Sequence, residues 1–124
     1  MIPKWIMAVA ALISLLGIFV GCSLYISPGT FIPDVDFTSK GVRFLAFMWG
    51  ARQVAIASII GYSVLRQSSA MLRIALAAYC LMNAQDVGIG VFMGDPGLIS
   101  GASLFALLSG SIIFVLSRPA KPAN

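Results

Sequence analysis

Four long apolar stretches dominate this sequence, and each is about as long as a lipid bilayer is thick. They cover residues 5–26, 43–65, 71–93 and 98–116. A helix needs about 20 predominantly apolar residues to cross the hydrocarbon core, so each stretch is predicted to form one transmembrane helix. The sequence therefore predicts an all-α fold in which residues 1–124 form a single transmembrane domain, an antiparallel bundle of four helices.

The composition supports a membrane protein and excludes several other classes. Hydrophobic residues make up 60% of the 124 residues and the mean hydropathy is +1.00, more than a soluble core of this size can use. Only 10% of the residues are charged, which excludes a long polar domain on either side. The net charge of +4 is dispersed over the flanks of the stretches and is not clustered with aromatic residues, so no nucleic-acid partner is expected.

The connections between the stretches contain residues that end helices. The first stretch stops at Ser-Pro-Gly in residues 27–29, which a helix does not continue through. Residues 66–69 and 94–97 form much shorter connections, and Pro96 suits the first position of the helix that follows. These lengths predict that the second and third helices, and the third and fourth, are antiparallel neighbours.

The basic residues are distributed unequally between the two sides of the predicted bundle. An even number of helices puts both termini and the second connection on one side, which carries five basic residues against two on the other. The five are Lys4, Arg66, Arg73, Arg118 and Lys121, and the two are Lys40 and Arg43. By the positive-inside rule, both termini are predicted to be cytoplasmic.

Two charged residues lie deep inside the apolar stretches, Arg52 in the second and Asp86 in the third. Arg52 lies nine positions after Arg43 and Asp86 nine positions before Asp95, so each is predicted to lie about 13 Å from the same side. An isolated charge in the bilayer costs at least about 2.5–3.5 kcal/mol, so such residues indicate a functional site. We expect Arg52 and Asp86 to contact each other, or to share a ligand, in the outer half of the membrane.

Asp86 belongs to a polar face of the third helix. Tyr79, Asn83, Asp86 and Gly90 follow one another at helical spacing and are predicted to face inward. Further candidate ligand-binding residues are Gln53, beside Arg52, and Ser103, which is predicted to reach the depth of Asp86 together with Ser100. Two interpretations remain open: a buried ion pair that only fixes helix register, or a pocket in which Asp86 accepts a proton or a hydrogen bond.

Small residues at four-residue spacing mark predicted contacts between helices. Gly17 and Gly21 form such a pair in the first helix, and Ala57 and Gly61 form one in the second. Small side chains let helix backbones approach closely in lipid, so packing is the simplest interpretation. They indicate a homo-oligomer only weakly.

Metal and cofactor chemistry has little support in the residue types present. The chain contains no histidine, and its two cysteines, Cys22 and Cys80, are far apart in sequence. No metal, haem or other cofactor is expected. The run Phe19 to Cys22 loosely resembles a lipoprotein cleavage box, but Phe19 fits such boxes poorly, and we expect the first segment to be retained.

Three short features of the sequence resemble those of a known family. Gly50-Ala51-Arg52 lies in the second stretch, a Pro-Gly loop follows the first, and Asp86 with Gly88 lies late in the third. Together they resemble a family of small four-helix membrane proteins that look related to DoxX-like proteins. The resemblance implies a compact four-helix bundle and no established substrate. Those proteins carry an acidic residue after the arginine, where this chain has Gln53, so Asp86 is the only acidic residue at depth.

The leading hypothesis is a non-catalytic membrane protein. It binds a membrane lipid or another lipophilic molecule inside the bundle, or it is an accessory subunit of a larger membrane complex. The first alternative is an intramembrane isomerase, cyclase or hydrolase of an apolar substrate, in which Asp86 acts as acid or base and Arg52, Asn83 and Tyr79 orient the substrate. The second is a proton-coupled small transporter in which Asp86 alternates between protonation states.

Overall fold

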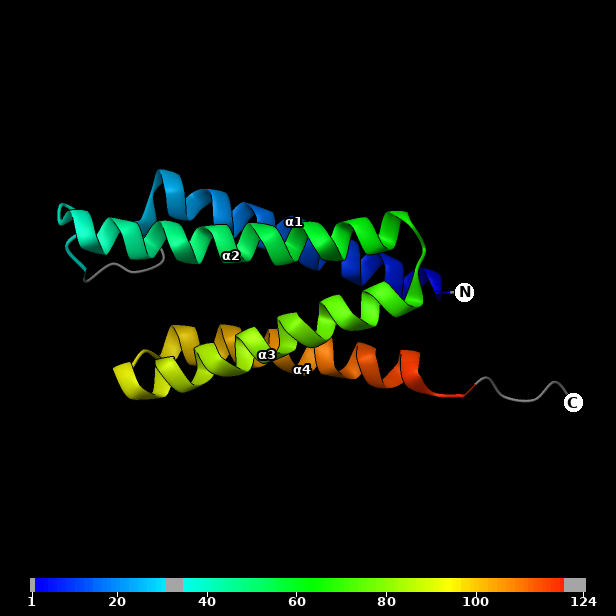
Figure 1. Cartoon of the computed structure of the whole chain (residues 1–124). Helices are drawn as coiled ribbons and strands as arrows, with labels where there is room; N and C mark the ends of the chain where they lie inside the picture. The colour runs from blue at the N-terminus through cyan, green and yellow to red at the C-terminus, as the bar shows by residue number, and fades with distance from the viewer. Residues whose placement is uncertain (1, 31–34, 120–124) are drawn as a thin grey trace, which may run out of the picture. The chain divides into compact units, whose positions relative to one another are not determined.

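Four helices of membrane-spanning length account for most of the chain in a computed structural model that describes residues 2–30 and 35–119 (Figure 1). In chain order the elements are α1 (Lys4–Ile26), the short 3-10 helix η1 (Pro28–Thr30), α2 (Lys40–Leu65), α3 (Ser69–Met93) and α4 (Pro96–Ser117). Each of the four α-helices is long and apolar enough to cross a membrane. The predicted all-α fold with four such helices is confirmed. Lys121, one of the basic residues from which the orientation of the termini was predicted, lies outside the described residues.

The helices form two hairpins, and each is described by itself. The first hairpin, residues 3–66, packs α1 against α2, and the second, which begins at residue 67, packs α3 against α4. Figure 1 shows the two helices of each hairpin running side by side in opposite directions. The predicted pairing of α3 with α4 is confirmed. The predicted pairing of α2 with α3 stays a prediction.

Side-chain caps explain why α3 and α4 each begin two residues before the predicted stretch. The Ser68 hydroxyl accepts a hydrogen bond from the Met71 N–H at 3.3 Å, and the Asp95 carboxylate accepts one from the Leu98 N–H at 3.1 Å. These bonds satisfy N–H groups that have no partner inside the first helical turn. Pro96 is the first residue of α4, as predicted, and Gly94 ends α3 in the left-handed conformation with φ at +66°.

The start of α2 is preceded by a polar turn outside the apolar region. The Thr38 N–H and hydroxyl both donate to Asp36 Oδ1, at 2.9 and 2.6 Å. These hydrogen bonds stabilise the charged carboxylate and lower the pKa of Asp36. The turn lets α2 begin at Lys40, three residues before the predicted stretch.

Glycines bring α1 and α2 into close contact, which confirms the prediction that the small residues mark helix packing. A Cβ added at Gly21 would lie 2.9 Å from the backbone oxygen of Gly50, and one added at Gly50 would lie 2.9 Å from the oxygen of Gly21. A Cβ at Gly17 would lie 2.7 Å from Cβ of Ala57. The pairs noted in the sequence therefore face each other within one hairpin, so no second copy of the chain is needed to explain them.

A buried hydrogen bond joins the same two helices. The Ser14 hydroxyl donates to the backbone oxygen of Ala57 at 2.7 Å, beside Gly61, which leaves room for that hydroxyl. Ser23, by contrast, donates to the oxygen of Phe19 in its own helix at 2.8 Å. Of these two bonds, only the one from Ser14 connects α1 with α2.

Replacing Ser14 should therefore cost more than replacing Ser23. We expect Ser14→Ala to lower the free energy of unfolding by about 0.6 kcal/mol and by no more than about 1.7 kcal/mol, the range for interhelical hydrogen bonds in bilayers. Ser23→Ala is the matched control, because its hydroxyl satisfies only its own helix. The measurement is unfolding in mixed micelles followed by circular dichroism. Equal losses in the two variants would show that the Ser14 bond adds nothing to the hairpin.

Candidate functional site

The polar face of α3 is buried, as its spacing predicts. Tyr79, Asn83 and Asp86 are each only 5% exposed, and Gly90 is also buried. Gln85, which lies between them in sequence but points in another direction, is exposed. The helix therefore turns three polar side chains away from lipid, and one of them is a carboxyl group.

Hydrogen bonding within α3 orders part of this face. The Asn83 side-chain amide donates to the backbone oxygen of Tyr79 at 2.8 Å. An amide has two N–H donors and an oxygen acceptor, and this bond uses one N–H of the side chain. Asn83 is thus held against the backbone of its own helix, on the same buried face as Asp86.

The register between α3 and α4 determines which residues lie level with Asp86. The Tyr79 and Phe105 rings meet edge to face with centroids 6.2 Å apart, and Cys80 Sγ lies 3.4 Å from the oxygen of Ala106. At the other end, a Cβ added at Gly90 would lie 2.9 Å from the Ile99 side chain. These contacts put the turn of α4 around residues 100–103 near the level of Asp86, and Ser103 in this turn is half-buried. Its predicted role in ligand binding stays a prediction.

Ser100 does not take the position expected of it. Its side chain is exposed, and its hydroxyl donates to the oxygen of Pro96 at 2.7 Å. A serine that bonds to its own helix in this way satisfies its hydroxyl locally. The expectation that Ser100 accompanies Ser103 near Asp86 is therefore wrong.

On α2, the candidate residues lie on different faces. Gln53 is buried at 9% exposure, between Gly50 and Ala57 on the face that packs against α1. Arg52, the next residue back, is half-buried on another face. Gln53 therefore belongs to the α1 contact, and its predicted role in ligand binding stays a prediction.

The indole N–H of Trp49 is a polar group on α2, and the sequence prediction did not include Trp49 in the site. Its indole Nε1 is buried and has no hydrogen-bond acceptor among the described residues. Buried N–H groups are nearly always paired, so this donor is a candidate hydrogen-bonding group. Its position three residues before Arg52, on the same face of the helix, was the available signal.

Counted from the helix ends, Arg52 and Asp86 do not have equal offsets. Arg52 lies twelve residues after the first residue of α2, and Asp86 lies seven residues before the last residue of α3. These offsets correspond to about 18 and 10 Å along the helix axes. Equal depth therefore depends on Arg43 and Asp95 marking the same membrane interface, and the pairing of Arg52 with Asp86 stays a prediction.

The described residues contain no group of three or more His, Cys, Asp and Glu side chains that is placed to hold a metal ion. Cys22 is exposed and Cys80 is half-buried, and neither is in a disulfide. The chemistry available at the polar face is therefore that of a carboxyl group, an amide and a phenol. Such groups bind polar atoms of a ligand or transfer a proton.

Comparisons with protein-family models, with curated proteins and with solved structures found no match to this chain. They neither support nor contradict the resemblance to DoxX-like proteins, which stays a prediction. The described residues establish a small protein with four helices able to span a membrane and a buried polar face on the third.

Proposed function

We propose that this protein is non-catalytic and binds a lipophilic molecule at the polar face of α3. The observation that carries the proposal is the joint burial of Tyr79, Asn83 and Asp86 on one face of a mostly apolar helix. Three adjacent buried polar groups suit the polar part of a bound molecule, since ligand sites are mostly apolar with a few precisely placed polar groups. The rings of Tyr79 and Phe105 supply an apolar wall next to them.

Arg52 and Trp49 are proposed to serve the same molecule from α2. The support is the equal spacing of Arg52 and Asp86 from Arg43 and Asp95, together with the buried indole N–H of Trp49. A guanidinium beside Asp86 would offset the cost of a carboxylate in the bilayer. The ligand would then be a mainly apolar molecule with one or two hydrogen-bonding groups.

Mass spectrometry of material copurified in mild detergent tests this function. We expect the wild-type chain to carry a stoichiometric apolar small molecule or lipid. Asn83→Leu should remove it, and Gln85→Leu, on the exposed side of the same helix, should keep it. A stoichiometric protein partner would instead support an accessory subunit, and the absence of any bound small molecule from the wild-type chain would contradict the proposal.

We also propose that both termini are cytoplasmic, because the side with both termini carries more basic residues. A reporter that is active only outside the cytoplasm should be silent when fused after Asn124 and active when inserted in the Gly94 to Gly97 connection. Neutralising Arg66 and Arg73 together should weaken this preference. The opposite pattern of activity would contradict the proposed orientation.

A further inference from the structure

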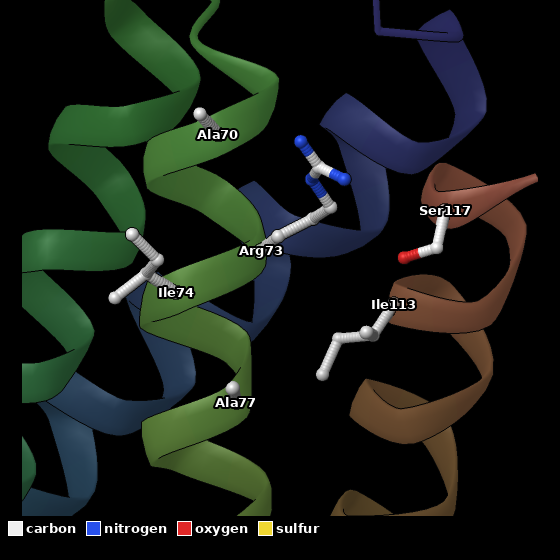
Figure 2. A pocket seen from close by; sticks show the side chains of 6 residues that line it. All are labelled: Ala70, Arg73, Ile74, Ala77, Ile113 and Ser117. Carbon is white, nitrogen blue, oxygen red and sulfur yellow. The ribbon is translucent and has the colours of Figure 1, made fainter.

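A shallow groove of about 280 Å³ lies between α3 and α4, at the end of the second hairpin where α3 begins and α4 ends. The residues that line it are Ala70, Arg73, Ile74, Ala77, Ile113 and Ser117 (Figure 2). In Figure 2 the Arg73 side chain extends from α3 toward α4, and the Ser117 hydroxyl points into the space between the two helices.

The groove changes from polar to apolar along the helix axes. Arg73 lies four residues after the start of α3, which is about 6 Å along the axis and near the level of lipid headgroups. One turn further from that end, Ala77 and Ile113 form its walls. The Arg73 guanidinium and the Ser117 hydroxyl therefore lie at the outer end of an apolar groove. This arrangement suits an amphipathic molecule with a short polar head.

The charged residues at this end of the hairpin indicate which charge the polar head of the bound molecule should carry. No Asp or Glu lies between Arg66 and Gln85 or after Pro96. In the part of the chain that the structure describes, neither the Arg73 guanidinium nor the Ser117 hydroxyl has a hydrogen-bond or ion-pair partner. Ser111 of the same helix, by contrast, donates to the oxygen of Leu107 at 2.7 Å. The start of α3 and the end of α4 lie at this same end, so their helix dipoles oppose each other and the positive charge of the groove is that of Arg73.

We propose that this groove binds an anionic glycerophospholipid, with its phosphate on Arg73 and Ser117 and one acyl chain along Ala77 and Ile113. Basic pockets between transmembrane helices are suited to acidic headgroups. The groove is separate from the polar face proposed to bind a ligand, because Asp86 lies thirteen residues beyond Arg73, about 20 Å along α3. The two proposals therefore succeed or fail independently.

Native mass spectrometry of the full-length chain, titrated in mild detergent with dioleoylphosphatidylglycerol or dioleoylphosphatidylcholine, tests the proposal. We expect the wild-type chain to bind the anionic lipid more tightly by roughly fivefold or more, the effect of one basic contact near a membrane surface. Arg73→Gln should abolish the preference. Arg66→Gln, which removes an equal charge from the exposed connection at the same end, should keep it.

A second pair of variants tests the acyl-chain channel without changing charge. Ala77→Phe fills the groove and should weaken binding of the anionic lipid several-fold, and Ala78→Phe, at the next exposed position and outside the groove, should not. Millimolar glycerol phosphate should fail to displace the lipid. The proposal would be overturned if the wild-type chain bound the two lipids with equal affinity, or if Arg66→Gln and Arg73→Gln lost the same affinity. It would also be overturned if the two phenylalanine variants had equal effects, or if glycerol phosphate displaced the lipid.

Discussion

If Asp86 is the counter-charge of Arg52, as predicted, Asp86→Asn should destabilise the protein by about 3–5 kcal/mol, because it would leave a guanidinium in the bilayer without its partner. Asp86 is only 5% exposed, so solvent does not compensate for the lost charge. The free energy of unfolding in mixed micelles is the quantity to measure. Asp95→Asn is the matched control, since asparagine caps a helix as well as aspartate does, and it should change stability little.

Replacing both charged residues should recover much of that loss. In the Arg52→Leu and Asp86→Leu double variant no charge remains in the bilayer, and buried pairs replaced by apolar residues are often as stable as the original. A double-mutant cycle then gives the interaction energy between the two residues. An interaction energy indistinguishable from zero would contradict the predicted pair, even if each single variant were unstable.

Gly50→Ala should be one of the most damaging small substitutions in the first hairpin. The new Cβ would lie 2.9 Å from the backbone oxygen of Gly21 and 3.0 Å from the ring of Tyr25. A ring can turn aside, but a backbone oxygen can move only if α1 moves away from α2. We expect a loss of about 1–3 kcal/mol, the usual cost of overpacking, and a larger loss for Gly50→Leu.

Gly88→Ala provides the control, because a Cβ there would meet nothing within 4 Å in the described part of the chain. Alanine is a better helix former than glycine, so this variant should be neutral or slightly stabilising. Gly21→Ala should resemble Gly50→Ala, since its Cβ would lie 2.9 Å from the oxygen of Gly50. If Gly50→Ala and Gly88→Ala had the same free energy of unfolding, the close contact between α1 and α2 would not be a source of stability.

The helices themselves followed from the sequence because span length and turn residues are local properties. Pro96 predicted the start of α4, and helical spacing predicted the buried face around Asp86. The caps by Ser68 and Asp95 were readable as well, although hydropathy alone starts these helices at their first apolar residues.

The parts that the sequence did not predict depend on how faces are shared between helices. Gln53 was grouped with Arg52 by proximity, yet Gly50, Gln53 and Ala57 share a face by spacing, and that face packs on α1. Ser100 was placed by depth alone, which does not say toward which side its hydroxyl points. The equal offsets of Arg52 and Asp86 were counted from charged residues that are not the helix ends.

The ligand content of the Arg52→Leu and Asp86→Leu double variant tests the central claim most directly. This variant should be nearly as stable as the wild-type chain, so loss of a bound molecule cannot be attributed to unfolding. If the polar face is a binding site, mass spectrometry of the variant purified in mild detergent will show a folded protein without the lipophilic molecule that the wild-type chain carries. If the stable double variant keeps that molecule, Asp86 and Arg52 only hold the helices in register, and the proposed site is wrong.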